Sequence, residues 1–518
     1  MRSPGSAISY LELLKLASPE AVVVISALVV LALGLMSKRT TVVTGVSPAA
    51  PSTTSAGIRA GTSAASCSLV AMLGVIVAIT AVRLLPRDAN LFGGMLVITP
   101  LTSLFKIVCL GLAFFTICLV KSEKWLRHPG EYLAIVLLAT VGLMLLVGSE
   151  ELLMIFIGLE LLGLSLYVMA AFDKSDARSA EAGLKYFLFG STSSAFTLFG
   201  ISLIYGMSGS TGLAAISEKL TSTPIQPLLA TGIIMTLIGF AFKIAAAPFH
   251  LWAPDAYQGA PIPSAAFIAS GSKVASFVVL GKIVLVGFAP IHGSSTWHAM
   301  IAGWSPLLAV LAALSILIGN LVALVQTNVR RLLAYSAVAH AGYTLLGLVA
   351  GSRNGFSATL FYVTVYAITL VGAFGVVAAV RSETGGDDLK NFAGLSRRAP
   401  VLAGCMAVFM LSLAGIPPLA GFFAKFYLFS AALRAGGNYG LLWLIGLALF
   451  GSFVSLYYYL IVLKAIFVDE PSSAISSPSD GRSLDLLQQI TVTALAAVVL
   501  FLGIVPDMLV ARIVAAIP

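Results

Sequence analysis

The chain has 518 residues, of which 59% are hydrophobic and only 10% are charged. Its mean hydropathy of +1.02 excludes an ordinary soluble protein, in which about a quarter of the residues are charged. The net charge of +9 would suggest a nucleic-acid partner in a soluble protein, but here the positive residues lie mostly at the ends of apolar runs, the pattern that sets membrane topology. We therefore expect an all-α polytopic membrane protein that binds no nucleic acid.

Apolar runs long enough to cross a bilayer recur along the whole chain. A helix needs about 17 residues or more to cross a hydrocarbon core about 30 Å thick. Fourteen runs meet this requirement: 19–36, 68–85, 101–120, 132–149, 152–172, 184–206, 228–248, 264–289, 305–326, 331–350, 356–380, 401–432, 439–467 and 486–513. The first run lacks a compact basic region and a small-residue cleavage site, so we interpret it as a retained span and not a cleaved signal.

The connections between these runs predict the orientation of the chain. Connections that follow odd-numbered spans hold fifteen lysines and arginines, whereas the termini and the other connections hold eight. Because cytoplasmic connections are enriched in lysine and arginine, both termini are predicted on the non-cytoplasmic side of the cell membrane. The largest polar insertions are 37–66 and 469–483.

Motifs for cofactor or metal chemistry are missing from the sequence. It has no P-loop, no dinucleotide fingerprint after a strand and no HExxH. The four cysteines are scattered and have neither metal-site nor disulfide spacing. They are Cys67, Cys109, Cys118 and Cys405, and we interpret all four as small core residues.

Two apolar runs are interrupted by proline. The first interruption is at Pro248, after Lys243; the second is at 414–421, before Lys425 and five spans later. Proline-interrupted spans at matching places in two halves are typical of inverted repeats, with sites at the breaks near mid-membrane. The predicted units are 1–130 for spans one to three, 131–290 for the first repeat, 304–467 for the second repeat and 484–518 for the last span.

A few ionisable residues lie deep in the predicted spans. Glu160 and Lys273 are placed about 12 to 13 Å into their helices by the rise of 1.5 Å per residue. A charged side chain at such a depth costs about 2.5 to 3.5 kcal/mol on insertion scales, which favours a functional role. The sequence predicts that titratable groups pass protons between them. The candidates are Glu160, Lys185, Lys243, Lys273, Lys425, His250 and His340.

Other polar residues favour simpler interpretations. Lys106, Lys282 and Lys464 lie nearer the ends of their runs, and we expect them to snorkel to an interface. The run Tyr457-Tyr458-Tyr459 favours packing or an interface belt over a site. His340 fits a satisfied core histidine as well as a functional one, and the sequence leaves both open.

The motifs together resemble the antiporter-like membrane subunits of respiratory complex I, over about 131–464. The residues that carry the resemblance are Gly158-Leu159-Glu160-Leu161, Lys185-Tyr186-Phe187-Leu188-Phe189-Gly190-Ser191, the run from Phe242-Lys243 through Pro248-Phe249-His250-Leu251-Trp252-Ala253-Pro254-Asp255 to Tyr257, Ala339-His340-Ala341-Gly342-Tyr343, and Gly415-Ile416-Pro417-Pro418 with Lys425-Phe426. The run 182–191 and the three tyrosines are most similar to the N-type branch of bacterial NADH-quinone oxidoreductase.

The resemblance implies fourteen helices in two inverted five-helix repeats, in a translocase subunit of the respiratory chain that moves protons as electrons pass from NADH to quinone. It implies that Glu160 and Lys243 form a coupled pair, that Lys185 modulates this pair, that Lys273 and His250 lie on a central hydrophilic axis, and that Lys425 stands at the exit. It implies no cofactor in this chain, with FMN and Fe–S clusters in partner subunits. The implied partners are antiporter-like neighbours and small membrane subunits.

Two departures from the family pattern stand out. The insertion 37–66 is longer than expected, and Ile461 follows the tyrosines where many relatives have arginine. Two other functions remain open: a subunit of a related cation/proton antiporter, which uses similar helices, and a structural membrane scaffold. A scaffold has no need of four deep ionisable residues in register with two breaks.

Overall fold

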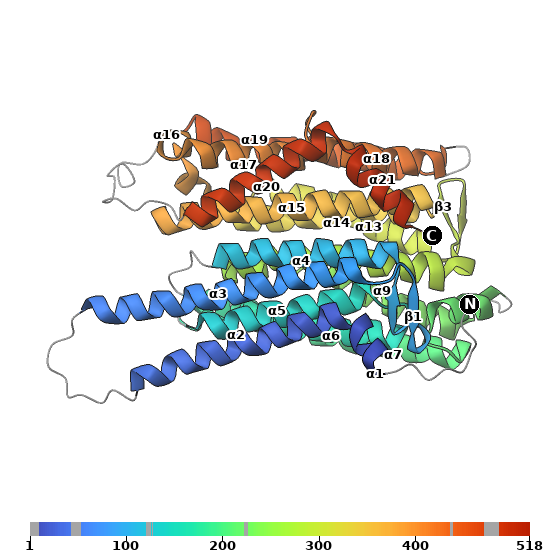
Figure 1. Cartoon of the computed structure of the whole chain (residues 1–518). Helices are drawn as coiled ribbons and strands as arrows, with labels where there is room; N and C mark the ends of the chain where they lie inside the picture. The colour runs from blue at the N-terminus through green and yellow to red at the C-terminus, as the bar shows by residue number, and fades with distance from the viewer. Residues whose placement is uncertain are drawn as a thin grey trace.

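The computed structural model describes residues 10–42, 53–120, 126, 128–221, 226–435, 439–470 and 486–517. Its helices run side by side along one direction, with the N-terminal helices on one flank and the C-terminal helices on the other (Figure 1). Within the described residues, twelve helices are long and apolar enough to cross a membrane by length and composition. Two shorter apolar helices accompany them, and both end at the predicted proline breaks.

The elements before the first break are α1 (Tyr10–Leu16), α2 (Ser18–Val42), α3 (Thr53–Leu84), β1 (Ala89–Leu91), η1 (Phe92–Gly94), β2 (Leu96–Ile98), α4 (Pro100–Val120), α5 (Pro129–Val147), α6 (Leu152–Ala170), α7 (Ala177–Ser208), α8 (Leu213–Thr221) and α9 (Pro227–Lys243). Helices α2 and α3 extend into the polar insertion 37–66, of which 43–52 lie outside the described residues. The polar connection 469–483 also falls largely outside them.

The elements after the first break are α10 (Trp252–Gly259), α11 (Ile262–Ala269), α12 (Gly271–Lys282), η2 (Ile283–Gly287), η3 (Ala289–Ile291), β3 (Ser294–Thr296), β4 (Ala299–Ile301), α13 (Trp304–Ala323), α14 (Val329–Val349), α15 (Arg353–Thr384), η4 (Leu389–Phe392), α16 (Leu395–Arg398), α17 (Pro400–Ala414), α18 (Ala420–Ala435), α19 (Leu442–Phe467), α20 (Leu486–Ile504) and α21 (Asp507–Ala516).

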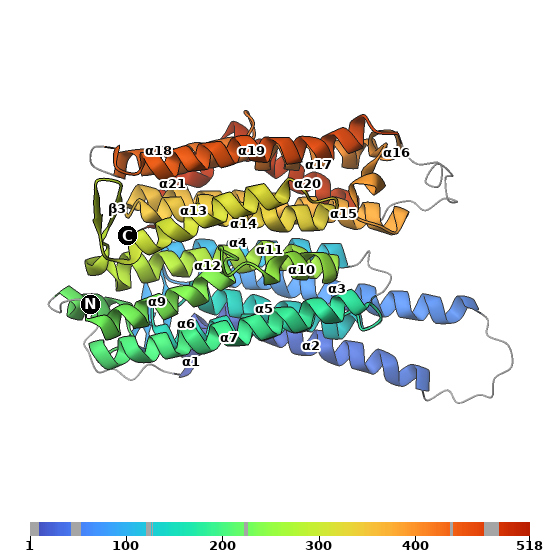
Figure 2. The same cartoon turned by 180° about the vertical axis from the view of Figure 1, so that it is seen from behind.

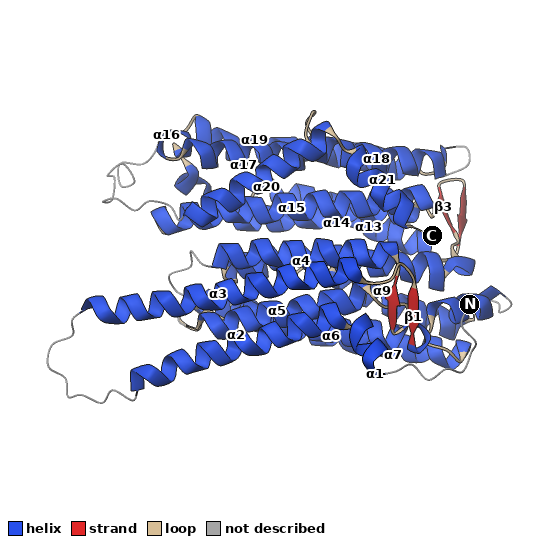
Figure 3. Ribbon diagram, viewed as in Figure 1, coloured by secondary structure: helices blue, strands red, loops and turns tan. Residues whose placement is uncertain are grey.

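Two small antiparallel hairpins, β1–β2 and β3–β4, cap one end of the bundle (Figure 3). An all-helical prediction did not anticipate them. Backbone groups inside a bilayer have no water to bond, so open strands are confined to places outside the hydrocarbon or within protein. The hairpin β1–β2 is tied to the bundle by a hydrogen bond from Val97 N to Gly148 O at 2.7 Å.

Helix α15 is the centre of the second half. Its residues from Gly355 to Val380 are buried, apart from Ile368. It packs against α11, α12, α14, α17, α18 and α20. A helix that is buried on all sides is hydrophobic all round. Side chains of several neighbouring helices therefore pack against α15.

The two helix breaks are satisfied in different ways. In the first, between α9 and α10, Ala247 N donates to Ser315 Oγ at 2.8 Å. In the second, between α17 and α18, Lys425 Nζ donates to Ala414 O at 2.9 Å. Backbone groups freed at membrane depth must find such partners. The first break is therefore held by a side chain of another helix, α13, and the second by Lys425, a predicted site residue on the helix that follows the break.

The four cysteines are all buried. The interpretation of them as core residues is confirmed.

Candidate functional site

The first candidate region is a small cavity of about 20 Å³ between α6, α7 and α9. Glu160 and Lys243 both line it, together with Tyr167 and Ser194. Ser194 Oγ donates a short hydrogen bond to Glu160 Oε1. The Lys243 side chain is almost fully buried, and its Nζ lies 6.0 Å from the ring centroid of Tyr167. A carboxyl group and an amine thus line one small cavity, and either can hold a proton there.

Lys185 on α7 forms two ion pairs. Its Nζ contacts Asp255 Oδ2 at 2.7 Å and Glu181 Oε1 at 2.6 Å. The Lys185 side chain is 40% exposed. Its implied modulation of the Glu160–Lys243 pair stays a prediction.

Lys273 lies in the middle of the bundle. Its Nζ donates to Ala337 O on α14 at 2.5 Å and is 5.3 Å from the ring centroid of Tyr366 on α15. The side chain is buried. A carbonyl oxygen and an aromatic face both favour the charged ammonium, so Lys273 has a cation site built from neutral groups.

His340 on α14 is bound at both ring nitrogens. Its Nδ1 is 2.7 Å from Tyr362 Oη, and its Nε2 is 3.0 Å from Tyr459 Oη. Tyr459 Oη is in turn 2.5 Å from Ser336 Oγ. A neutral imidazole donates from one nitrogen and accepts at the other, so this chain of hydroxyls and imidazole can pass a proton by reversing its donors. Both ring nitrogens are satisfied, which fits a core histidine as well as a proton carrier, so the functional role of His340 stays a prediction.

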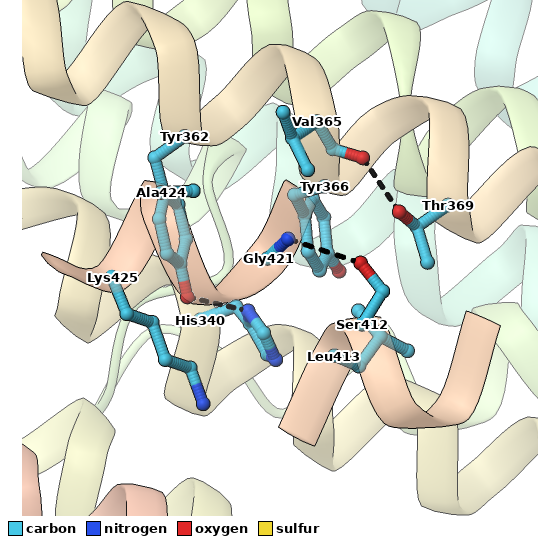
Figure 4. Close-up of a pocket in the computed structure, with 10 residues that line it drawn as sticks. All are labelled: His340, Tyr362, Val365, Tyr366, Thr369, Ser412, Leu413, Gly421, Ala424 and Lys425. Carbon is cyan, nitrogen blue, oxygen red and sulfur yellow. Dashed lines mark hydrogen bonds between the residues drawn. The ribbon is translucent and has the colours of Figure 1, made fainter. Parts of the chain in front are cut away.

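The second candidate region is a small cavity of about 10 Å³ beside these hydrogen-bonded groups, lined by His340, Tyr362, Ser412 and Lys425 among others. Figure 4 shows the Lys425 side chain alongside the hydrogen-bonded Tyr362 and His340. Lys425 Nζ donates to Ser452 Oγ at 2.8 Å as well as to Ala414 O. The second break, the lysine and the histidine chain therefore meet at one place.

His250 is buried beside the first break, and its ring centroid is 6.3 Å from that of Tyr335 on α14. It lines neither cavity. Its placement on an axis between the two cavities stays a prediction.

Two lysines contradict the snorkelling interpretation. Lys106 is 1% exposed and pairs with Glu20 Oε1 at 2.7 Å, and Lys282 is also buried and lies 3.3 Å from Glu150 Oε1. Both side chains are enclosed by neighbouring helices before they reach an interface. Lys464, by contrast, is 64% exposed and contacts Asp469 at 3.4 Å, as expected of a snorkelling lysine.

The tyrosine run divides between the two expected roles, packing and an interface position. Tyr457 is 62% exposed and fits an interface position, but Tyr458 and Tyr459 are fully buried. Tyr459 belongs to the histidine chain, and Tyr458 Oη donates to Asn320 Oδ1 at 3.0 Å. Sequence reasoning also missed Tyr362 and Tyr366, although their four-residue spacing places both on one face of a helix.

Comparison with known proteins gives these cavities a context. Residues 149–455 match the family model described as NADH:quinone oxidoreductase/Mrp antiporter, TM. NADH-quinone oxidoreductase subunit N 2 of Acidobacterium capsulatum is 45% identical, over 97% of this chain and 98% of that protein.

The chain belongs to the NADH:quinone oxidoreductase/Mrp antiporter family of membrane subunits. The resemblance drawn from the motifs is confirmed.

Solved structures agree with this membership. One chain of respiratory complex I from Thermus thermophilus with bound aureothin is 32% identical to this protein, with a TM-score of 0.74. The match spans 96% of this protein and 100% of the Thermus chain. A chain of the Mrp complex from Dietzia sp. shares the fold at 21% identity, with a TM-score of 0.76. All seven predicted path residues lie inside the matched 149–455. In the described part of the chain, no cluster of three metal-ligating side chains is found.

Proposed function

We propose that this chain acts as the N-type membrane subunit of a proton-pumping NADH-quinone oxidoreductase. The observation that carries the proposal is a line of buried titratable residues inside a chain that is 45% identical, almost end to end, to a subunit N. Burying several charged groups in a membrane bundle is costly unless they serve transport. The chain would move protons while partner subunits pass electrons from NADH to quinone.

The proposed path runs from the first cavity to the second. A proton is shared between Glu160 and Lys243, passes toward Lys273 at the centre, and reaches the histidine chain of His340. Lys425 receives it at the second break. The titratable side chains that line both cavities and the hydroxyl–imidazole contacts of His340 support this path, since such groups can pass protons by reversal of hydrogen bonds.

The proposed topology has fourteen spans, with α9–α10 and α17–α18 each counted as one broken span. The proposed repeats are 131–290 and 304–467, between the N-terminal unit 1–130 and the last span in 484–518. Both termini are proposed on the non-cytoplasmic side. In support, the elements at both described ends, α1 and α21, lie toward the end that carries the hairpins, and α16 with its Arg397 and Arg398 lies at the opposite end (Figure 1).

The proposed setting is the cell membrane, within a complex that also holds antiporter-like and small membrane subunits. FMN and Fe–S clusters are assigned to those partners, and quinone is a substrate of the whole complex. This chain itself is proposed to carry no redox centre, because its buried polar residues are proton carriers and not a cofactor site.

The experiment is the Lys243→Ala variant in the assembled complex, with proton pumping measured in inverted vesicles as dye quenching per NADH oxidised. We expect pumping to be abolished or sharply cut while the complex still assembles. Lys464→Ala is the matched control, because it removes an exposed lysine at a helix end and should leave pumping unchanged. Unchanged pumping in Lys243→Ala would remove Lys243 from the path.

A further inference from the structure

The short helix α10 follows the first break and lies between α7 and α14 (Figure 2). Its C-terminal carbonyls face the side chain of Arg330, which donates to Tyr257 O at 2.8 Å and to Ala260 O. The last carbonyls of a helix lack partners within the helix and carry partial negative charge. A fully buried arginine therefore fixes this end of α10 to the second half of the chain.

One carboxylate on α10 joins two cations from different halves. Asp255 Oδ2 accepts from Lys185 Nζ on α7 at 2.7 Å, and Asp255 Oδ1 accepts from Arg331 Nη1 on α14 at 2.8 Å. Arg331 also donates to Gln258 Oε1 on the same helix, at 3.2 Å. Asp255 thus forms a bridge from the first half to the second.

Arg330 and Arg331 lie at a helix position that is unfavourable for positive charge. Both lie in the first turn of α14, near the positive end of the helix dipole. Their partners Asp255, Asp387 and the end of α10 supply the compensating negative charge. Arg331 is 32% exposed and binds α10 at two residues, Asp255 and Gln258. Lys185 is 40% exposed and has a second partner, Glu181, on its own helix. Lys185 is therefore the contact that can break while α10 stays bound to α14.

A packed contact connects this bridge to Lys243. Trp252 lies three residues before Asp255, so both point from the same side of α10. The Trp252 ring stacks on Tyr186, with centroids 4.2 Å apart and an interplanar angle of 5°, and Trp252 Nε1 donates to Phe242 O at 3.0 Å. Tyr186 in turn lies 6.0 Å from Lys243 Nζ. Any displacement of α10 must therefore alter the surroundings of Lys243.

We propose that Asp255 is a positioning residue for proton transfer, which links the charge of Lys185 to the first cavity through α10 and to the second through α14. When Lys185 holds Asp255, α10 keeps Trp252 against Tyr186 and Phe242. When Lys185 leaves, Asp255 stays with Arg331, and α10 follows α14, the helix that carries His340. The inference rests on the proposed function, because it assigns Asp255 a part in the same transport.

The test compares Asp255→Asn and Asp255→Glu in the assembled complex, with protons pumped per NADH oxidised as the readout and native electrophoresis as the check on assembly. Asp255→Asn should lower this ratio about five-fold, the low end for a coupling between sites, while Asp255→Glu restores most of it. Glu383→Gln is the matched control, because it breaks the Arg398–Glu383 pair of 2.9 Å within the second half. Its ratio should equal that of the unaltered complex.

A second variant keeps the proposal falsifiable if Asp255→Asn fails to assemble. Lys185→Gln leaves the Asp255–Arg331 pair in place and should lower the ratio to the same extent, and the double variant should be no worse than either single one. The proposed role of Asp255 would be overturned if Lys185→Gln left the ratio of protons pumped per NADH unchanged. It would also be overturned if the fold-losses of the two single variants multiplied in the double variant. Lys243→Ala in parallel separates the two ideas: loss there with normal pumping in Asp255→Asn overturns only the bridge, while normal pumping in both overturns the proposed function.

Discussion

The lysines of the two cavities have different neighbouring groups. In the first, Lys243 shares the space with the carboxylate of Glu160. In the second, none of the described residues that line the cavity carries a carboxylate, and Lys425 is bound by a carbonyl and a hydroxyl beside a histidine chain. The first region can therefore hold its proton as an ion pair or as a neutral pair, whereas the second holds a single cation that neutral groups stabilise.

This difference suggests how two similar helix breaks can serve transport in a single direction, with proton uptake at one and release at the other. A charge near an opposite charge is favoured, and a charge that only neutral dipoles solvate is released more readily. A pair suits the uptake of a proton, and a lone lysine beside a hydroxyl chain suits its release. Four variants test this contrast between the two cavities.

The largest effect is expected from Glu160→Gln, which keeps the side-chain size but leaves the first cavity with a lysine and no carboxylate. Proton pumping per NADH oxidised should fall about ten-fold or more, which corresponds to about 1.4 kcal/mol of lost interaction. The measurement is dye quenching in inverted vesicles, with the exposed Glu218→Gln as control. If Glu160→Gln pumped as many protons per NADH as the control, the proposed difference between the two cavities would be wrong.

Lys425→Met should have the next largest effect. It removes the cation of the second cavity but strands no carboxylate, so only Ala414 O and Ser452 Oγ lose a partner. We expect an about five-fold loss of pumping, or about 1 kcal/mol, the net value of a typical hydrogen bond. The same vesicle assay measures it, with Lys425→Arg retaining more activity. A loss greater than that of Glu160→Gln would reverse the assigned roles.

Tyr459→Phe tests the histidine chain alone. The change removes the hydroxyl between His340 and Ser336, while the contact of His340 with Tyr362 remains. Pumping should fall about two-fold, in line with a net hydrogen bond of about 0.5 kcal/mol. Tyr457→Phe, on the exposed first tyrosine of the run, is the control. Equal behaviour of the two variants would exclude Tyr459 from the path.

Lys106→Met separates a structural buried lysine from those on the path. Pumping per NADH should stay unchanged, but the complex should lose thermal stability, because removing one partner of a buried pair costs about 3 to 5 kcal/mol. Adding Glu20→Gln should recover most of the loss, as no buried carboxylate is then left unpaired. Thermal inactivation of the purified complex measures both, and a pumping defect in the double variant would place Lys106 on the path.

The spans were predictable because hydrophobicity along the chain decides them. The predicted runs 19–36 and 101–120 match candidate spans at Ser18–Met36 and Pro100–Val120 within a residue. The interruption at Pro248 was also predictable, since proline removes a backbone donor wherever it stands. The short amphipathic helix α8 was missed, because it is too brief to resemble a span.

The partners of the site residues were not predictable, because they come from distant parts of the chain. His340 binds Tyr459, which lies 119 residues away in sequence. Lys106 lies near the end of an apolar run, and the sequence cannot show that Glu20 on another helix encloses it. Successive residues of a helix point about 100° apart, so three adjacent tyrosines have three different surroundings.

The enclosure of α15 has a consequence for biogenesis. The chain is made from its N-terminus, so α15 leaves the ribosome before α17, α18 and α20, which later cover it. During that interval the second cavity lacks the side that α17 and α18 later supply, which includes Ser412 and Lys425. The hydroxyl of Tyr362 already has its partner His340 on the earlier helix α14, so the late helices complete the packing around α15 and not this hydrogen bond.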